Sequence, residues 1–214
     1  MSYADWAAPI VPIQKTNGTI RICGDFKVTV NKVCQPDKYP LPRIEDLYAK
    51  LSGGTVFSVL DLSMAYQQII VSMETRKYLT INTTKGLFAF NRLPAGISAA
   101  PGIFQRIMDA LFSNVEGVVC YLDDILVTGK NKHEHDKNLD IVFNILYRSG
   151  LKLKHDKCLL AKSSVKYLGH VIDAQGLHPV QDKVVSIKNA PSPTNIPELQ
   201  SFIGLICYYM QILV

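Results

Sequence analysis

The hydrophobic and polar positions of this chain follow two spacings, and the strand spacing recurs in pairs. Short runs rich in β-branched and aromatic residues, several of them joined by turn signals, predict strands. Asn17-Gly18 and Lys85-Gly86 each stand between two such runs and predict hairpins. The predicted strands cover residues 10–14, 19–23, 56–62, 78–82, 87–91, 118–122, 125–128, 158–161 and 165–172.

Apolar residues that recur every three or four positions predict helices among these strands. The predicted helices cover residues 43–51, 99–112, 134–149, 180–187 and 197–213. Strands and helices are mixed along the chain, and the strands form hairpins rather than regular β-α-β units. The pattern therefore predicts an α+β fold.

The composition is that of an ordinary globular protein. The chain has 214 residues, of which 48% are hydrophobic and 19% charged, which excludes a disordered or collagen-like chain. Asp123 and Asp124 interrupt the longest apolar stretch, so no run reaches the roughly 18–20 residues that a membrane span needs. The five cysteines are scattered, and the N-terminus lacks a signal-peptide pattern. We therefore expect an intracellular protein, cytoplasmic or nuclear, with reduced thiols and no membrane partner.

Positive charge is concentrated in one stretch of the sequence. The formal net charge is +5, and residues 130–170 hold nine Lys or Arg against four Asp or Glu, which gives +5 for this stretch alone. A basic stretch suits a polyanion such as a nucleic acid, but a solvated helix face has the same composition. Charge alone leaves both interpretations open.

Two adjacent aspartates, Asp123 and Asp124, lie inside an otherwise apolar predicted hairpin. Burying an unpartnered carboxylate costs several kcal/mol, and two neighbouring carboxylates repel each other. Either a divalent cation or an ordinary solvated turn explains the pair. Asp61, near the end of the predicted strand 56–62, favours the cation, because that strand can bring a third carboxylate to the same place.

The residues around these carboxylates resemble the palm of a reverse transcriptase. Asp61 lies in the block Leu-Asp-Leu-Ser-Met-Ala-Tyr at residues 60–66, and Tyr-Leu-Asp-Asp follows at residues 121–124. Further blocks carry the resemblance at residues 6–11, 21–27, 39–42, 90–96, 151–154, 167–172 and 201–205. Over essentially its whole length the chain is similar to the Pol polyprotein of gypsy-type long-terminal-repeat retrotransposons.

The resemblance implies the right-hand fold of polymerases, with an antiparallel palm sheet. By the family pattern, residues 1–52 and 69–98 form the fingers, residues 53–68 and 99–173 form the palm, and residues 174–214 start a truncated thumb. The implied activity is that of an RNA-directed DNA polymerase, which adds dNTPs to a primer 3′-hydroxyl by two-metal phosphoryl transfer. The implied partners are an RNA or DNA template, a DNA or RNA primer, and the RNase H, integrase and protease modules of a full polyprotein.

The same resemblance implies a set of site residues. Asp61, Asp123 and Asp124, with the carbonyl of Leu62, would bind two catalytic Mg²⁺ ions, for which Mn²⁺ is the substitute. The residues implied to contact the incoming nucleotide are Lys15, Arg21, Tyr66 and Ala95. Those implied to contact primer or template are Gln105, Arg106, Tyr121, Leu122, Tyr167, Leu168 and Gly169.

Several of these assignments have alternatives. Lys15 and Arg21 are implied to grip the triphosphate, whereas edge hairpins are often cationic without a further role. Tyr66 is implied to exclude a 2′-hydroxyl and so to favour DNA over RNA synthesis; its alternative is a core tyrosine. Ala95 and Lys27 depart from the residues usual in the family, so a catalytically impaired nucleic-acid-binding remnant is the alternative function.

A second group of residues has a metal-ligand composition. The run His133-Glu134-His135-Asp136 lacks further ligands at a suitable spacing. We interpret it as an exposed helix start with acidic residues in the first turn. The isolated His155, His170 and His178 are given the same structural interpretation.

Overall fold

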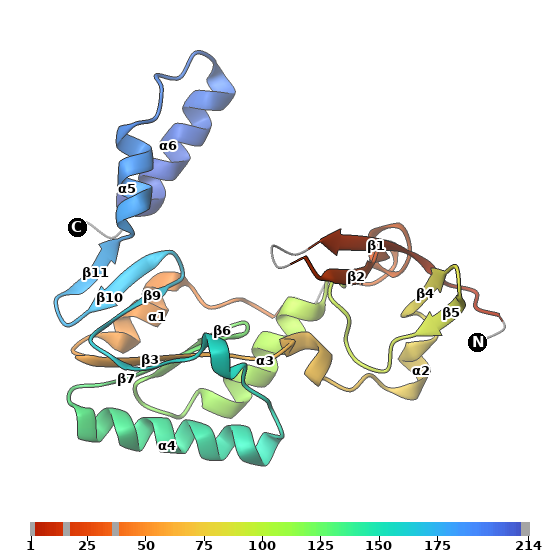
Figure 1. Ribbon diagram of the computed structural model, residues 1–214, viewed down its shortest axis with the longest axis horizontal. Coiled ribbons are helices and arrows are strands. Elements are labelled where there is room, and N and C mark those ends of the chain that lie inside the picture. Colours follow the sequence, from red (N-terminus) through yellow and green to blue (C-terminus); the bar gives the residue numbers. More distant parts are fainter. Residues whose placement is uncertain (1–2, 15–17, 36–38, 211–214) are drawn as a thin grey trace.

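The computed structural model describes residues 3–14, 18–35 and 39–210 and contains three β-sheets with helices packed around them (Figure 1). The strands are β1 Ala8–Gln14, β2 Ile20–Gly24, β3 Val56–Asp61, β4 Thr80–Thr83, β5 Gly86–Ala89, β6 Val118–Tyr121, β7 Asp124–Gly129, β8 Leu159–Lys162, β9 Ser164–Tyr167, β10 His170–Asp173 and β11 Gly176–Pro179. The α-helices are α1 Ile44–Leu51, α2 Met73–Arg76, α3 Ala100–Phe112, α4 Lys132–Ser149, α5 Gln181–Lys188 and α6 Ile196–Met210. Short 3-10 helices are η1 Phe26–Val28, η2 Val30–Lys32, η3 Ala65–Gln68 and η4 His155–Lys157. The predicted α+β class is confirmed.

The central sheet has the strand order β6-β7-β3-β8, and its neighbouring strands are antiparallel. Both of its faces are covered, because α3 and α4 pack on one face while α1 and strands β9 and β10 pack on the other (Figure 1). Successive residues of a strand therefore alternate between two cores. Leu60 and Ile125 belong to the core with α3 and α4, and Val59 and Leu126 to the core with α1. Burial on both faces explains why these strands are continuous apolar runs in the sequence.

A second sheet, which we call the N-terminal sheet, has the order β2-β1-β4-β5 and lies apart from the central sheet (Figure 1, right). Its strands β1 and β2 form the hairpin predicted around Asn17-Gly18, with Ile13 paired to Arg21. A separate core that includes Phe26, Ile81 and Leu93 packs beneath it. The molecule therefore has two parts, and the chain passes between them before α1, after β3 through η3, and again on the way into α3.

The third sheet has the order β11-β10-β9 and leads into the C-terminal helices. Helices α5 and α6 pack against each other and extend away from the sheets (Figure 1, top). None of the helices within the described residues combines the length and the apolar character that crossing a membrane requires.

Most predicted elements are found within one or two residues of their predicted ends, but one prediction was wrong. Residues 165–172 form two antiparallel strands rather than one, because Leu168 and Gly169 make a tight turn with φ of 45° and 82°. The family resemblance implies a hairpin at residues 167–169, but the apolar pattern does not predict it, because a leucine occupies the first turn position and a non-glycine residue rarely adopts a positive φ. Helix α2 and strand β11 were also not predicted from the sequence.

Candidate active site

The three predicted metal-ligating aspartates lie at one end of the central sheet. Strand β3 ends at Asp61, which pairs with Asp124 at the start of the antiparallel strand β7. Asp123 lies one residue earlier, in the turn between β6 and β7. The prediction that the strand of Asp61 lies beside the Asp123-Asp124 hairpin is confirmed. We call this end of the sheet, with its three carboxylates, the acidic end.

The turn that carries Asp123 has a strained backbone. Tyr121 pairs with Asp124, so Leu122 and Asp123 form a two-residue turn. Leu122 has a φ of 54°, a left-handed conformation that costs a non-glycine residue about 1–2 kcal/mol. A positive φ at the first position of such a turn matches the twist of antiparallel strands. The turn is therefore tight, and the Asp123 side chain is exposed at its tip.

The three carboxylates of the acidic end interact with one another. Burial raises the pKa of Asp124 above its ordinary value, and the negative charges of Asp123 and Asp61 raise it further. The nearby ammonium of Lys157 acts in the opposite direction. The acidic end is thus a place where the fold gathers more negative charge than the protein itself neutralises.

Lys157 was not predicted as a site residue from the sequence, yet it forms an ion pair with Asp61. Its Nζ lies 3.0 Å from Asp61 Oδ2, and this hydrogen bond raises the pKa of Lys157. The contact arises because residues 152–154 lie alongside residues 61–63, with the Lys154 N–H donating to the Asp61 carbonyl at 2.8 Å. Part of the basic stretch therefore lies against the acidic end, but a separation of 96 positions conceals the pair in the sequence.

A cavity of about 520 Å³ lies between the acidic end and strand β2 of the N-terminal sheet. We call it the active-site cavity. The predicted site residues that line it are Arg21, Asp61, Leu62, Tyr66, Ala95 and Asp123. Lys154 and Lys157 line it as well, so carboxylates and cations share one opening. Lys15, the remaining nucleotide-binding prediction, lies outside the described residues.

Tyr66 both lines this cavity and packs against the core. Its ring meets the ring of Phe104 edge-on, with centroids 5.4 Å apart, and burial together with the charge of Asp123 raises the pKa of its hydroxyl. The turn that carries it is held by Gln68, whose Nε2 donates to the carbonyls of Ser63 and Lys152 at 2.7 and 2.9 Å. Tyr66 therefore packs against the core and also borders the active-site cavity. Its interpretation as a core tyrosine is compatible with its interpretation as a nucleotide-binding residue.

The donor set of the acidic end suits a hard divalent cation. Three carboxylates supply the oxygen ligands that Mg²⁺ and Mn²⁺ accept, and their mutual repulsion is relieved by a bound cation. In the described part of the chain, no group of three or more His, Cys, Asp or Glu side chains is arranged to hold a metal ion as it stands. The Asp61 carboxylate instead contacts Lys157. Metal ligation by these residues therefore stays a prediction that the chemistry of the donor set supports.

The residues predicted to contact primer or template have different surroundings. Gln105 is fully buried, and its side chain bonds the β6–β7 hairpin, so the predicted direct template contact was wrong for this residue. Arg106 is exposed, with its guanidinium 5.8 Å from the ring centroid of Tyr39. Tyr167 is buried, and its hydroxyl donates to the Asp124 carbonyl at 3.3 Å. The remaining members border the acidic end or form the turn after β9: Tyr121, Leu122, Leu168 and Gly169.

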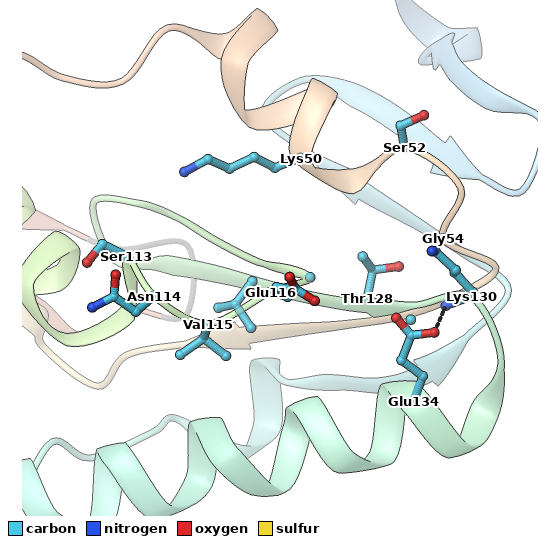
Figure 2. A pocket seen from close by; sticks show the side chains of 13 residues that line it. Lys50, Ser52, Gly54, Ser113, Asn114, Val115, Glu116, Thr128, Lys130 and Glu134 are labelled. Carbon is cyan, nitrogen blue, oxygen red and sulfur yellow. Dashed lines mark hydrogen bonds between the residues drawn. The ribbon is translucent and has the colours of Figure 1, made fainter.

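A second cavity, of about 460 Å³, lies at the opposite end of the central sheet (Figure 2). It is bordered by the end of α1, the loop between α3 and β6, and the start of α4. Its charges are mixed, with Lys50 and Lys130 near Glu116 and Glu134, and the Lys130 N–H donates to Glu134 at 3.3 Å. It contains none of the predicted site residues, so we place no function there.

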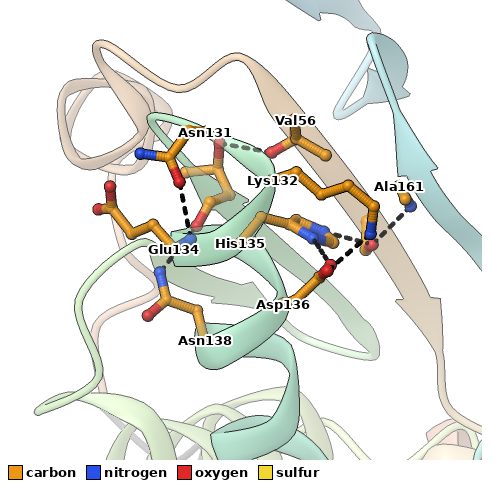
Figure 3. Close-up of polar contacts among 10 residues, drawn as sticks. Val56, Asn131, Lys132, Glu134, His135, Asp136, Asn138 and Ala161 are labelled. Atoms are coloured by element: carbon orange, nitrogen blue, oxygen red, sulfur yellow. Dashed lines mark hydrogen bonds and ion pairs between the residues drawn. The ribbon is translucent and has the colours of Figure 1, made fainter.

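The run that starts α4 was predicted to be exposed, and for His135 this was wrong (Figure 3). His135 is fully buried against the central sheet: its Nε2 lies 2.7 Å from Ser58 Oγ and its Nδ1 lies 2.9 Å from Asp136. Ser58 also accepts the Ala161 N–H at 3.0 Å. The helix turns this histidine inward because it lies three positions before the buried Asn138 and seven before the buried Val142. We call Ser58, His135 and Asp136, with their partners, the histidine cluster.

His170 was also interpreted as an exposed histidine without a functional role, but it is buried. Its Nδ1 lies 2.8 Å from the hydroxyl of Tyr48 on α1, and the two rings meet edge-on. Burial lowers the pKa of His170 below its ordinary value. Both histidines therefore serve packing between elements, which their isolated positions in the sequence did not reveal.

Comparison with known proteins shows the family to which the chain belongs. The sequence pattern that defines the family "Reverse transcriptase (RNA-dependent DNA polymerase)" matches residues 13–172. The uncharacterized protein K02A2.6 of Caenorhabditis elegans is 39% identical over 206 residues, which are 95% of this chain and 16% of that protein. The transposon Tf2-3 polyprotein of Schizosaccharomyces pombe is 36% identical over 204 residues, which are 94% of this chain and 15% of the polyprotein. The chain thus spans about a sixth of the length of these curated relatives.

Solved structures give the same fold. A foamy viral protease-reverse transcriptase in complex with double-stranded DNA superposes with a TM-score of 0.87 at 26% identity, covering 96% of this chain and 36% of that chain. The same kind of protein in complex with an RNA/DNA hybrid gives a TM-score of 0.81 at 25% identity, covering 97% and 28%. The fold is therefore the polymerase fold of reverse transcriptases. The chain belongs to the reverse transcriptase family, and retrotransposon polyproteins are among its relatives.

Proposed function

We propose that this chain is the polymerase core of a retroelement Pol polyprotein and that it adds dNTPs to a primer 3′-hydroxyl on an RNA template. The observation that carries the proposal is the meeting of Asp61, Asp123 and Asp124 at one end of the central sheet, beside the active-site cavity. The foamy viral relatives were solved with double-stranded DNA and with an RNA/DNA hybrid, which supports a primer–template duplex as the partner. The Tf2 relatives are polyproteins, which supports further Pol modules in the whole protein.

The division into fingers, palm and thumb belongs to the same proposal. The N-terminal sheet with its own core suits the fingers, the central sheet suits the palm, and α5 and α6 suit the start of a thumb. The gypsy-type assignment rests on the sequence blocks alone and is part of the proposal. In this arrangement the active-site cavity lies between fingers and palm, where a nucleotide would contact both.

The acidic end provides the ligands for the metal ions of the reaction. Asp61, Asp123, Asp124 and the carbonyl of Leu62 would hold two Mg²⁺ ions, or Mn²⁺ in their place. When bound, the ions supply positive charge to the attacking oxygen, the phosphoryl group and the leaving pyrophosphate. The protein contributes position and electrostatics, and no covalent intermediate is needed.

The remaining residues of the cavity would bind and select the nucleotide. Arg21 is exposed on the cavity wall and would neutralise the charge of a triphosphate. Lys157, beside Asp61, adds a second cation on the opposite wall. Tyr66 is fixed against Phe104 and would leave no room for a 2′-hydroxyl at the sugar. Together these side chains favour a deoxynucleoside triphosphate.

Primer extension on an RNA template with Mg²⁺ and dNTPs tests the proposal. The wild-type chain should extend the primer, Asp123→Asn should not, and Asp140→Asn on the outer face of α4 serves as the matched control. No extension by a folded wild-type chain that still binds primer–template would favour the alternative of an impaired remnant. Ala95→Phe, which restores the residue usual in gypsy-type relatives, would then show whether that departure silenced the enzyme.

A further inference from the structure

Gln105 is a fully buried amide in the middle of α3, among apolar neighbours such as Phe104 and Met108. A buried amide is costly unless its donors and acceptor are paired. Its Oε1 accepts the N–H of Leu122 at 2.7 Å, and its Nε2 donates to the Cys120 carbonyl at 3.1 Å. Two of its bonds therefore reach the hairpin that carries Asp123 and Asp124.

The Leu122 N–H belongs to the residue with the strained backbone. A non-glycine residue at φ 54° stays in this conformation only when its surroundings hold it there. The oxygen of the fully buried Gln105 accepts from this residue at a distance of 2.7 Å. Gln105 thus bonds the first position of the turn whose second position is Asp123.

Asp109 fixes which way the Gln105 amide points. Its Oδ1 accepts from Gln105 Nε2 at 2.9 Å, while its Oδ2 accepts from the hydroxyl of Tyr39 at 2.6 Å. A carboxylate can only accept, so the NH₂ of Gln105 must face Asp109 and the oxygen must face Leu122. The chain Tyr39–Asp109–Gln105 therefore connects the segment before α1 with the turn of the acidic end.

We propose that Gln105 is a positioning residue, which holds the Leu122-Asp123 turn in its strained conformation, and that Asp109 orients its amide. The link to catalysis rests on the proposed function, because it assumes that Asp123 takes part in nucleotide addition. The link to the turn does not rest on it, since it concerns only contacts within the protein. This role replaces the template contact predicted for Gln105.

Two substitutions at position 105 separate the hydrogen bonds from side-chain size. Gln105→Met keeps the side-chain length but removes every hydrogen bond of the side chain. Gln105→Asn keeps an amide but shortens the side chain by one methylene, which moves the amide away from its partners. Asn144→Leu, an exposed amide on the outer face of α4, is the matched control. If Gln105→Met does not fold, Gln105→Asn carries the test through the same readouts.

The first readout is hydrogen exchange at the Leu122 amide, measured without metal or nucleotide. We expect exchange to be faster by about tenfold or more in both Gln105 variants and unchanged in Asn144→Leu. The second readout is primer extension, in which kcat should fall by about tenfold while the KM for dNTP stays within about twofold. Unchanged exchange at Leu122, or a loss of kcat that merely follows the loss of folded protein, would overturn the proposal.

A charge exchange between the two partners tests the orienting role of Asp109. Gln105→Glu places two carboxylates face to face and should lower kcat, whereas the double variant Gln105→Glu/Asp109→Asn restores one donor between them and should recover part of the loss, because the bond to the Cys120 carbonyl stays broken in both. No recovery in the double variant would contradict the role of Asp109. If the wild-type chain extends no primer, the proposed function fails, and the exchange of Leu122 alone decides whether Gln105 holds the turn.

Discussion

Two polar clusters lie along the same strand of the central sheet, and they differ in how completely the protein satisfies them. In the histidine cluster, Ser58 and His135 are hydrogen-bonded to each other, and each has one further partner: the Ala161 N–H for Ser58 and the Asp136 carboxylate for His135. The negative charge of Asp136 is paired with the Lys132 ammonium. Three residues further along β3, at the acidic end, three carboxylates lie together, and within the described residues Lys157 forms an ion pair with one of them, Asp61.

This difference shows how a structural polar cluster is told from a functional one. Buried polar groups that are fully paired connect elements and need nothing from outside. Carboxylates that repel one another are tolerated where a bound cation neutralises their charge, and carboxyl groups with shifted pKa values in a cavity are typical of functional sites. The acidic end fits the second description, and the histidine cluster fits the first although its residue types are those of a catalytic triad.

The largest expected effect comes from removing one carboxylate of the acidic end. Asp123→Asn should lower primer extension by about 10³-fold or more, because the ligand set for the metal ions is broken. Folding should be intact, since the exposed Asp123 loses only a repulsive charge. Extension rates at several Mg²⁺ concentrations, with circular dichroism as the check on folding, measure both. Unchanged extension would remove Asp123 from the site.

The next effect concerns selection of the sugar. Tyr66→Ala should raise incorporation of ribonucleotides relative to deoxyribonucleotides by about tenfold or more, because the ring no longer fills the space beside the sugar. Tyr147→Ala is the control, since this tyrosine is 87% exposed on α4. Competition between NTP and dNTP on one template gives the ratio. An unchanged ratio would make Tyr66 a core tyrosine only.

The histidine cluster should respond in stability rather than in activity. Ser58→Ala leaves the Ala161 N–H and His135 Nε2 unpaired in a buried place, and should cost about 1–3 kcal/mol of folding free energy. The activity per folded molecule should stay within about twofold. Denaturant unfolding measures the first quantity, with the exposed Ser186→Ala as control. A loss of activity without a loss of stability would instead indicate that the histidine cluster is a functional site.

The smallest expected effect is a stabilisation at the acidic end. Burial and the neighbouring carboxylates raise the pKa of Asp124, so its charged form destabilises the folded, metal-free protein above that pKa. Asp124→Asn should therefore raise the Tm by a few degrees near pH 7 in EDTA. Because the wild-type carboxyl takes up its proton as the pH falls through the raised pKa, the gain should shrink toward acid. A gain that is equal at all pH values would contradict this cause.

Most of the helices and strands could be predicted from the sequence because they depend on local patterns, whereas the meeting of Asp61 with Asp123 and Asp124 was expected from the family resemblance. Apolar runs with turn signals gave the strands, and two carboxylates inside such a run stood out. What could not be predicted depends on contacts between distant residues. Lys157 reaches Asp61 only through the pairing of residues 152–154 with 61–63, and the inward side of α4 decides that His135 is buried.

Gln105 shows the same limit from another side. The family resemblance placed it on a helix near the site and implied a template contact, and its burial could not be expected from its residue type, because glutamine is mostly exposed. Only the packing of α3 against β6 shows that the amide faces the hairpin. Residue type and spacing thus indicate in which part of the molecule a residue lies, and the tertiary contacts show what its side chain does there.

Binding of Mn²⁺ tests the central claim of this account most directly, because it asks whether the acidic end takes up the cation that its excess charge implies. Electron paramagnetic resonance of free Mn²⁺ would be recorded with the wild-type chain, Asp123→Asn and Ser58→Ala, with dNTP present. We expect the wild-type chain and Ser58→Ala to bind alike and Asp123→Asn to bind at least about tenfold more weakly. Equal binding by wild-type and Asp123→Asn would contradict the account.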